Sequence, residues 1–170
     1  MIRPSYRIVE YYPRSPALFE EEKARILAVL DVDGSRVAHI GNTAVPGLAS
    51  KPIIDLMVGV PVMEDAGVFV ERLQGIGYEH RGDTVPGTLY LRKAEPQRYN
   101  LHVTAYEGES WVERLLFRDC LRAHPAVARE YEELKRGVMA RLAHDPPAYN
   151  DAKAEFIEAV VVRARVRQSS

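Results

Sequence analysis

Apolar and polar residues follow two different periods along the first part of this chain. Residues 16–30 (PALFEEEKARILAVL) and 63–77 (MEDAGVFVERLQGIG) have apolar side chains at helical spacing, so each predicts an amphipathic helix. Residues 37–40 (VAHI) indicate a short strand. Residues 52–60 (PIIDLMVGV) are almost continuously apolar, which is typical of a strand buried on both faces, and Asp55 is the one interruption.

Two further β-rich runs lie close together in the sequence. Residues 87–92 (GTLYLR) and 98–106 (RYNLHVTAY) are separated only by KAEPQ and therefore predict a hairpin. After residue 107 the pattern becomes helical, with prolines at the boundaries between helices. The three helices predicted there cover residues 111–123, 126–144 and 148–167. This order of elements predicts an α+β fold in a single domain, with a mixed sheet flanked by helices (1–106) and a helical section packed on it (107–170).

The composition narrows the class of protein. Apolar residues make up 46% and charged residues 28% of the 170 residues, a balance typical of a globular chain with its own core. One cysteine, Cys120, excludes an internal disulfide, and no apolar run approaches the ~20 residues of a membrane span. The N-terminus lacks a signal-peptide pattern, so we expect a cytoplasmic protein that does not bind membranes. The net charge of −1 argues against bulk binding of nucleic acid, and any affinity for phosphate must come from a local site.

The most informative stretch is residues 39–60, HIGNTAVPGLASKPIIDLMVGV. Gly41 follows the first strand and permits a tight turn, whose backbone N–H groups suit an anion such as phosphate. Asn42 and Thr43 supply short polar side chains at this turn, and Lys51 adds a positive charge before the next strand. An ordinary turn with a helix cap has the same Gly–Asn pair, so the pair alone leaves both interpretations open.

Asp55 is the second informative feature. A carboxylate inside an apolar strand is costly unless it is hydrogen-bonded, paired with a cation or bound to a metal. Taken alone, Asp55 fits an internal hydrogen-bond acceptor as well as a metal ligand. A glycine-led polar loop, 13 intervening residues and a strand aspartate together indicate a phosphate loop that faces a metal-binding carboxylate.

The same stretch closely resembles the signature of the GrpB family, which is placed in the nucleotidyltransferase superfamily with the DNA polymerase β-like fold. The resemblance covers essentially the whole chain. It implies a nucleotidyltransferase-like sheet, one GrpB-like domain over residues 1–170, and transfer of a nucleotidyl group from an NTP to an acceptor. The other matching segments are VEYYPRSPALFEEE (9–22), LHV (101–103), FRDCLRAHP (117–125), YEELK (131–135) and YNDAKAEFI (149–157).

The resemblance also implies roles for single residues. In the superfamily a Gly–Ser pair grips the nucleotide phosphates, and three acids on the strands hold two divalent metal ions. Gly41 matches the glycine, and Asn42 stands in place of the serine. Asp55 matches the first acid, but Met57 occupies the position of the second and no acid occupies the third. One carboxylate is a poor clamp for two Mg²⁺ ions.

Two histidines are candidates to complete a metal site. His39, Asp55 and His102 are predicted on three neighbouring strands, and together they suit a softer divalent ion such as Mn²⁺ or Zn²⁺, since imidazole prefers those metals, whereas the superfamily resemblance implies Mg²⁺. Asp55 and His102 are then the candidate catalytic residues. The alternatives are strand histidines that simply hydrogen-bond to a neighbour, and a phosphate site that uses one metal ion or none.

The predicted hairpin offers further phosphate ligands. Tyr90 and Arg92 alternate along one strand and so share a face, and Arg98 begins the next strand. Arginines there suit phosphate oxygens in a bidentate geometry. Solvated charges on an edge strand are an equal alternative.

The helical section contains a second set of candidates. Arg118 and Arg122 are four residues apart and face the same way, so they are candidates to reach the cleft between the sheet and the helices, although surface or interdomain salt bridges are the more common role for such residues. Lys135, Tyr149 and Lys153 match family motif positions. The two lysines are candidates for a phosphate-binding wall, and solvated helix faces are the alternative.

Two functions are therefore compatible with the sequence. The first is a nucleotidyltransferase in which Gly41, Asn42 and Thr43 hold the phosphates of an NTP beside a divalent metal. The second is a non-catalytic or differently catalytic protein that binds a nucleotide or another phosphorylated small molecule on a degenerate transferase fold. The two missing acids are the feature that favours the second.

Overall fold

The structure, a computed structural model, describes residues 11–169 except Thr84 and residues 143–144. Within these residues, five strands form one mixed sheet in the order β1-β2-β5-β4-β3. β2 and β5 run parallel, and the other neighbouring strands are antiparallel. The strands are β1 (Val37–Ile40), β2 (Ile54–Val60), β3 (Glu79–His80), β4 (Thr88–Lys93) and β5 (Tyr99–Ala105).

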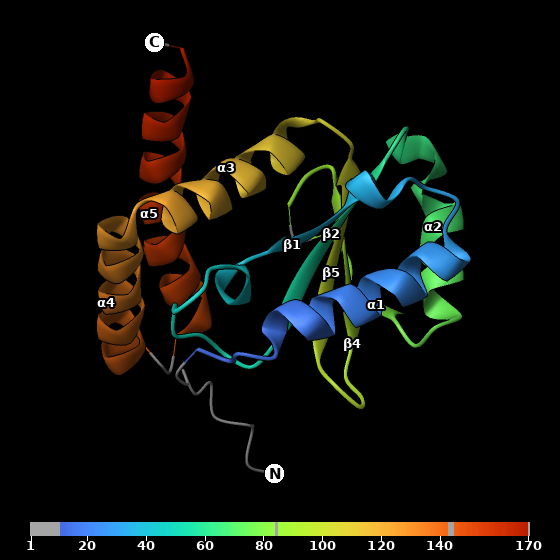
Figure 1. Ribbon diagram of the computed structural model, residues 1–170, viewed down its shortest axis with the longest axis horizontal. Coiled ribbons are helices and arrows are strands. Elements are labelled where there is room, and N and C mark those ends of the chain that lie inside the picture. The colour runs from blue at the N-terminus through green and yellow to red at the C-terminus, as the bar shows by residue number, and fades with distance from the viewer. Residues whose placement is uncertain (1–10, 84, 143–144, 170) are drawn as a thin grey trace.

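The α-helices of the described residues lie in two groups (Figure 1). Helices α1 and α2 pack on one face of the sheet. Helices α3, α4 and α5 pack on one another at the other side, where α3 contacts β5 and β1. The α-helices are α1 (Ser15–Val29), α2 (Ala66–Gln74), α3 (Glu109–Ala123), α4 (Pro125–Leu142) and α5 (Pro146–Gln168).

This architecture confirms the predicted α+β fold, including the hairpin of β4 and β5 and the C-terminal helices that begin at prolines. The helix predicted over residues 63–77 is shorter, because Met63–Asp65 form a 3₁₀ turn and the α-helix ends before Gly75. Strand β3 was not predicted, since it has only two residues and both are exposed. No helix among the described residues is long and apolar enough to cross a membrane.

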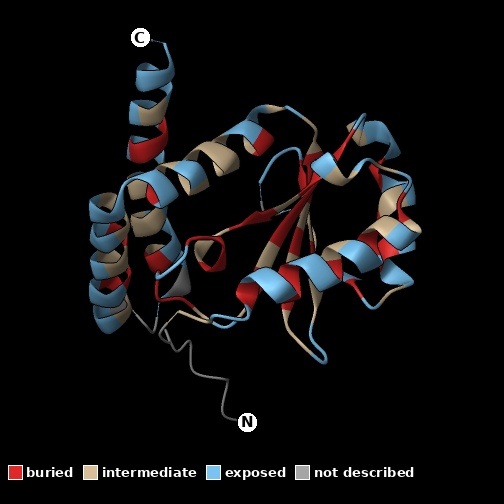
Figure 2. Ribbon diagram, in the orientation of Figure 1, coloured by how far each residue is buried: buried red, intermediate tan, exposed pale blue. Residues whose placement is uncertain are grey.

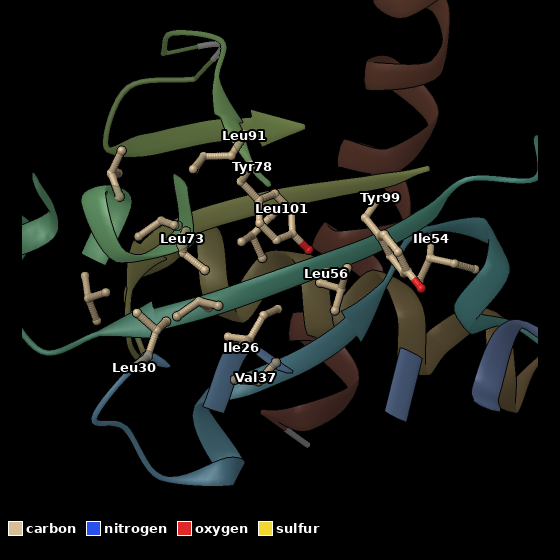
Figure 3. Close-up of a cluster of buried hydrophobic side chains, with 14 of the residues drawn as sticks. Ile26, Leu30, Val37, Ile54, Leu56, Leu73, Tyr78, Leu91, Tyr99 and Leu101 are labelled. Carbon is tan, nitrogen blue, oxygen red and sulfur yellow. The ribbon is translucent and has the colours of Figure 1, made fainter. Parts of the chain in front are cut away.

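The largest apolar cluster fills the space between the sheet and helices α1 and α2 (Figures 2 and 3). Leu56, Leu101 and Leu91 occupy paired positions on β2, β5 and β4, so a row of buried leucines crosses the sheet. Ile26 of α1 and Leu73 of α2 belong to the same cluster. Because side chains alternate along a strand, the residues directly before and after each of these leucines in the sequence point to the opposite face of the sheet, where the candidate site lies.

Glu22 of α1 is a charged side chain within this apolar layer, and it is fully buried. Its Oε1 atom accepts hydrogen bonds from the Tyr78 hydroxyl and from Lys93 Nζ, both at 2.9 Å. Its Oε2 atom accepts a bond from Arg25 at 2.9 Å. A buried carboxylate is tolerated only when it is paired, so this cluster joins α1 to β4 and to the segment before β3.

We expect Glu22→Gln to lower the free energy of unfolding by about 3–5 kcal/mol, because it leaves the mostly buried Lys93 ammonium without its counter-charge. Urea unfolding followed by circular dichroism measures this change. Glu20→Gln, an exposed position on the same helix, is the matched control and should alter stability by less than about 0.5 kcal/mol. A loss for Glu22→Gln no larger than that of the control would contradict the assigned role.

Candidate functional site

The loop that leaves β1 is shaped by Gly41. Its φ of 73° and ψ of −167° lie in a region that is essentially restricted to glycine. A Cβ atom at this position would lie only 2.7 Å from Oδ2 of Asp55. The glycine therefore lets the loop backbone pass directly against the carboxylate, and Asn42–Ala44 continue as a 3₁₀ turn.

Asp55 lies on β2, paired with Ile40 on one side and with Asn100 of β5 on the other. The Asn100 side chain donates a hydrogen bond to Asp55, and Asn100 Oδ1 accepts one from the Tyr90 hydroxyl at 2.8 Å. Burial raises the pKa of Asp55 to about 6, and the bond from Asn100 and the charges of nearby cations partly oppose this rise. The carboxylate is thus held in one orientation in a setting that disfavours its charge.

A cavity of about 310 Å³ opens beside Asp55, between the sheet and helices α4 and α5. Its walls bring together seven residues that the sequence singled out as site candidates: Asn42, Thr43, Lys51, Asp55, Tyr90, Arg98 and Lys153. Lys135 and Tyr149, which match family motif positions, line the same cavity. Ser50, Ile53 and Asn150 also line it and were missed, although all three lie within or beside the family-like segments.

Positive charge dominates this cavity. Lys51, Lys135, Lys153 and Arg98 line it, whereas Asp55 is the only acidic side chain among its described lining residues. Burial, followed by the charges of Lys153 and Arg98, lowers the pKa of Lys51 to about 8. Burial likewise lowers the pKa of Lys135 to about 7 and that of Lys153 below its usual value. These shifts mean that partly desolvated cations stand close together, an arrangement that an anion would stabilise.

The cations come from separate parts of the chain. Lys51 precedes β2, Arg98 precedes β5, and Lys135 and Lys153 lie on α4 and α5. The ammonium groups of Lys51 and Lys153 lie 5.7 Å and 4.6 Å from the centre of the Tyr149 ring. The Lys135 ammonium donates a 2.7 Å hydrogen bond to the Ala49 carbonyl, which holds the loop before β2 against α4.

Two buried polar atoms at the cavity have no hydrogen-bond partner. They are Ser50 Oγ and Arg98 Nε, both in residues that line the cavity. Buried donors without a partner are few in native proteins. Both groups can act as hydrogen-bond donors, and the residues that carry them belong to the cavity wall.

The structure corrects the metal site that was predicted from His39, Asp55 and His102. His39 pairs with Leu56, not with Asp55, and it therefore faces the opposite side of the sheet. Its ring stacks on Phe19 at 4.8 Å, and its Nε2 atom is 2.9 Å from the Thr43 hydroxyl. Within the described parts of the chain, no group of three His, Cys, Asp or Glu side chains is placed to hold a metal ion.

His102 does share the face of Asp55, but it lies outside the cavity lining. Its ring packs 5.4 Å from that of Tyr90, and its buried Nδ1 atom has no partner. Burial and the nearby Arg114 charge lower the pKa of His102 to about 3, so the ring is neutral. Arg114 of α3, which the sequence analysis missed, also acts electrostatically on Asp55.

Arg118 and Arg122 do not line the cavity beside Asp55. Arg118 donates to the His39 carbonyl at 3.0 Å and Arg122 to the Ala44 carbonyl at 2.7 Å. They line a separate cavity of about 440 Å³ on the other side of the loop. Their observed role is to fasten the Gly41 loop to α3. Arg92 shares the face of Asn100 but likewise does not line the cavity beside Asp55.

Comparison with known proteins relates most of this chain to one protein family. A family model described as GrpB protein matches residues 5–163. UPF0157 protein YqkA of Bacillus subtilis is 36% identical over 161 residues, which cover 93% of this chain and 47% of that protein, so the chain spans about half its length. Glutamate-rich protein GrpB of Alkalihalophilus pseudofirmus is 32% identical over 151 residues, covering 85% of this chain and 87% of that protein.

A solved structure extends the similarity to three dimensions. The crystal structure of conserved protein GrpB from Enterococcus faecalis superimposes with a TM-score of 0.83 at 32% sequence identity. The alignment covers 96% of this chain and all of the other. The sheet and both helical groups are therefore shared with that protein.

We expect Gly41→Ala to lower the free energy of unfolding by at least about 1–3 kcal/mol, because alanine is strained at this backbone conformation and its methyl group collides with Asp55. Gly47→Ala is the matched control, since Gly47 also has a positive φ but a Cβ there would meet no atom within 4 Å. Chemical denaturation of both variants separates the collision from backbone strain. Equal losses for the two variants would show that the contact with Asp55 is unimportant.

The pKa of Asp55 predicts an unusual pH dependence of stability. Because this pKa is about 6 in the folded protein against an ordinary 3.8, the folded state binds more protons between these values, and stability falls as the pH rises through that range. We therefore expect Asp55→Asn to melt at a higher temperature than the wild type at pH 8, with the advantage disappearing below about pH 4. Differential scanning calorimetry at several pH values measures this.

Asp33→Asn provides a control of opposite sign, because a hydrogen bond from Ser35 lowers the pKa of the exposed Asp33. That variant should lose stability at pH 8. An Asp55→Asn protein less stable than the wild type at pH 8 would contradict the electrostatic account of the site.

Proposed function

The chain belongs to the GrpB family, and we propose that it binds a nucleotide or another phosphorylated small molecule in the cavity beside Asp55. The observation that carries this proposal is the lining of the cavity, where three lysines and one arginine face a single carboxylate. Phosphate groups are the common biological ligands that bring several negative charges in a small volume. A volume of about 310 Å³ lies within the range of small-molecule sites.

The polar loop supplies complementary contacts. Asn42 and Thr43 line the cavity next to Gly41, and their amide and hydroxyl groups can donate hydrogen bonds to phosphate oxygens. The hydroxyl of Thr43 is oriented by its contact with His39 on the other side of the loop. Positive charge from the lysines and directional donors from the loop together favour an anion over a neutral ligand.

A two-metal centre of the kind that the transferase resemblance implies does not fit these residues. Asp55 is the only carboxylate among the described residues that line the cavity, and Met57 packs with Ile40 and Trp111 in an apolar cluster. The Asn100 carbonyl oxygen already accepts the Tyr90 hydroxyl. We therefore derive no step that depends on a bound metal ion.

Nucleotidyl transfer is a second candidate, and Asp55 is the observation that favours it. A carboxylate with a pKa of about 6 is mostly ionised near neutral pH yet is basic enough to accept a proton. In this hypothesis the hydroxyl oxygen of the acceptor attacks the α-phosphorus of an NTP and pyrophosphate leaves. Asp55 takes the proton that the hydroxyl loses. The orientation imposed by Asn100 and Tyr90 suits such a role.

A thermal-shift panel tests the binding proposal. The four NTPs and pyrophosphate, each with Mg²⁺ and with EDTA, should raise the melting temperature, while the corresponding nucleosides should not. A ligand present at about 100 times its dissociation constant stabilises by ~2.7 kcal/mol, which corresponds to roughly 5–10 °C for a chain of this size. No shift with any phosphorylated compound under either condition would refute binding.

The transfer hypothesis is tested separately, by pyrophosphate release from an NTP in the presence of candidate hydroxyl acceptors. Asp55→Ala should abolish release if Asp55 is the base. Unchanged release by Asp55→Ala would remove Asp55 from the chemistry and leave phosphate-ligand binding as the function.

A further inference from the structure

We infer that this cavity binds an oligophosphate group without a divalent metal ion, and that Lys51, Lys153 and Arg98 neutralise the charge that metal ions neutralise in a two-metal site. The inference rests on the proposed function and specifies how the ligand is held. It names the ligand class as a chain of two or more phosphates, whether free or part of a larger molecule.

The balance of charge at the cavity is the first support. Among the described residues, four cationic side chains and one carboxylate line it, so the excess is up to three positive charges, less the fraction of Lys135 that its pKa of about 7 leaves neutral. A single phosphate group carries about 1.5–2 negative charges near pH 7, which leaves part of this excess uncompensated. A di- or triphosphate matches it more closely. A divalent cation placed in the same cavity would be repelled by these groups.

The geometry of the lysines is the second support. Lys51 and Lys153 reach the Tyr149 ring from different elements, the segment before β2 and helix α5. Lys135 is 1% exposed and its ammonium group donates a hydrogen bond to the Ala49 carbonyl, so it contributes positive charge to the cavity without contacting a ligand directly. Lys51 and Lys153 approach one ring from the sheet side and the helical side of the cavity, and we assign them to neighbouring phosphates of one ligand.

The unpartnered donors are the third support. Ser50 Oγ and Arg98 Nε are both buried, lack hydrogen-bond partners and belong to residues of the cavity wall. Arg98 Nε cannot coordinate a metal ion, because an arginine has no acceptor atom, whereas a serine hydroxyl can bind either a metal ion or a phosphate oxygen. The Arg98 donor therefore fits an anion and not a metal ion.

The role of Asp55 follows from the same argument. Its carboxylate is the one acidic group, within the part of the chain that the structure describes, that lines the cavity and repels a phosphate directly. If Asp55 held a metal ion that bridged to the ligand, its loss would abolish binding. If the lysines bind the ligand unaided, its neutralisation should preserve binding or strengthen it.

Isothermal titration calorimetry with inorganic triphosphate distinguishes these cases. In EDTA the wild type should bind triphosphate, and excess Mg²⁺ should leave the affinity unchanged or weaken it. Asp55→Asn should bind at least as tightly as the wild type in EDTA. Lys153→Met should weaken binding by about tenfold or more, the loss expected for one charged hydrogen bond. Arg163→Met, which removes an exposed charge from the same helix, is the matched control and should not alter binding.

Binding seen only with Mg²⁺, or abolished by Asp55→Asn, would overturn the metal-free inference while leaving the proposed function intact. Nucleotide binding in the thermal-shift panel without any binding of inorganic triphosphate would overturn the oligophosphate assignment alone. Failure of every phosphorylated compound in both experiments would refute the proposed function and the inference together.

Discussion

The contact between the Gly41 backbone and the Asp55 carboxylate is the constraint on which the site depends. Ile40 pairs with Asp55 across the antiparallel strands β1 and β2, so the chain must leave the sheet directly above the carboxylate. Only a residue without a Cβ fits there. Arg118 and Arg122 then hold the carbonyl groups at the two ends of the turn, and the polar side chains of the turn face the cavity.

The same sheet carries two chemically different layers. On one face the row of leucines packs against helices α1 and α2, and the buried Glu22 of α1 is compensated at short range by Lys93 and Arg25. On the other face, partly buried lysines stand together with one carboxylate. This contrast separates the face of the sheet that packs against α1 and α2 from the face that lines the cavity.

Local patterns in the sequence were sufficient to predict four of the five described strands, the hairpin and the C-terminal helices, and together with the family resemblance they singled out seven of the residues that line the cavity. The failures came from information that local patterns do not contain. His39 was placed with Asp55 because both lie on adjacent strands, but a shift of one residue in strand pairing reverses the face, and pairing is set by the whole sheet. Arg118 and Lys153 look alike as helical cations. Because their helices pack differently, Arg118 donates to the backbone carbonyl of His39, whereas Lys153 lines the cavity. Ser50 has no local signal at all, since its importance lies in the partner that its hydroxyl lacks.

The distribution of the cations over separate elements has a mechanical consequence. Lys51 and Arg98 belong to the sheet side, whereas Lys135 and Lys153 belong to α4 and α5, so their mutual repulsion acts across the junction between these parts. The bond from Lys135 to the Ala49 carbonyl and the apolar contacts of Val45 and Leu48 with Tyr131 resist that repulsion. Repulsion between the two sets of cations therefore opposes the packing of the C-terminal helices on the sheet. A polyanion bound between them would offset this repulsion and strengthen that packing.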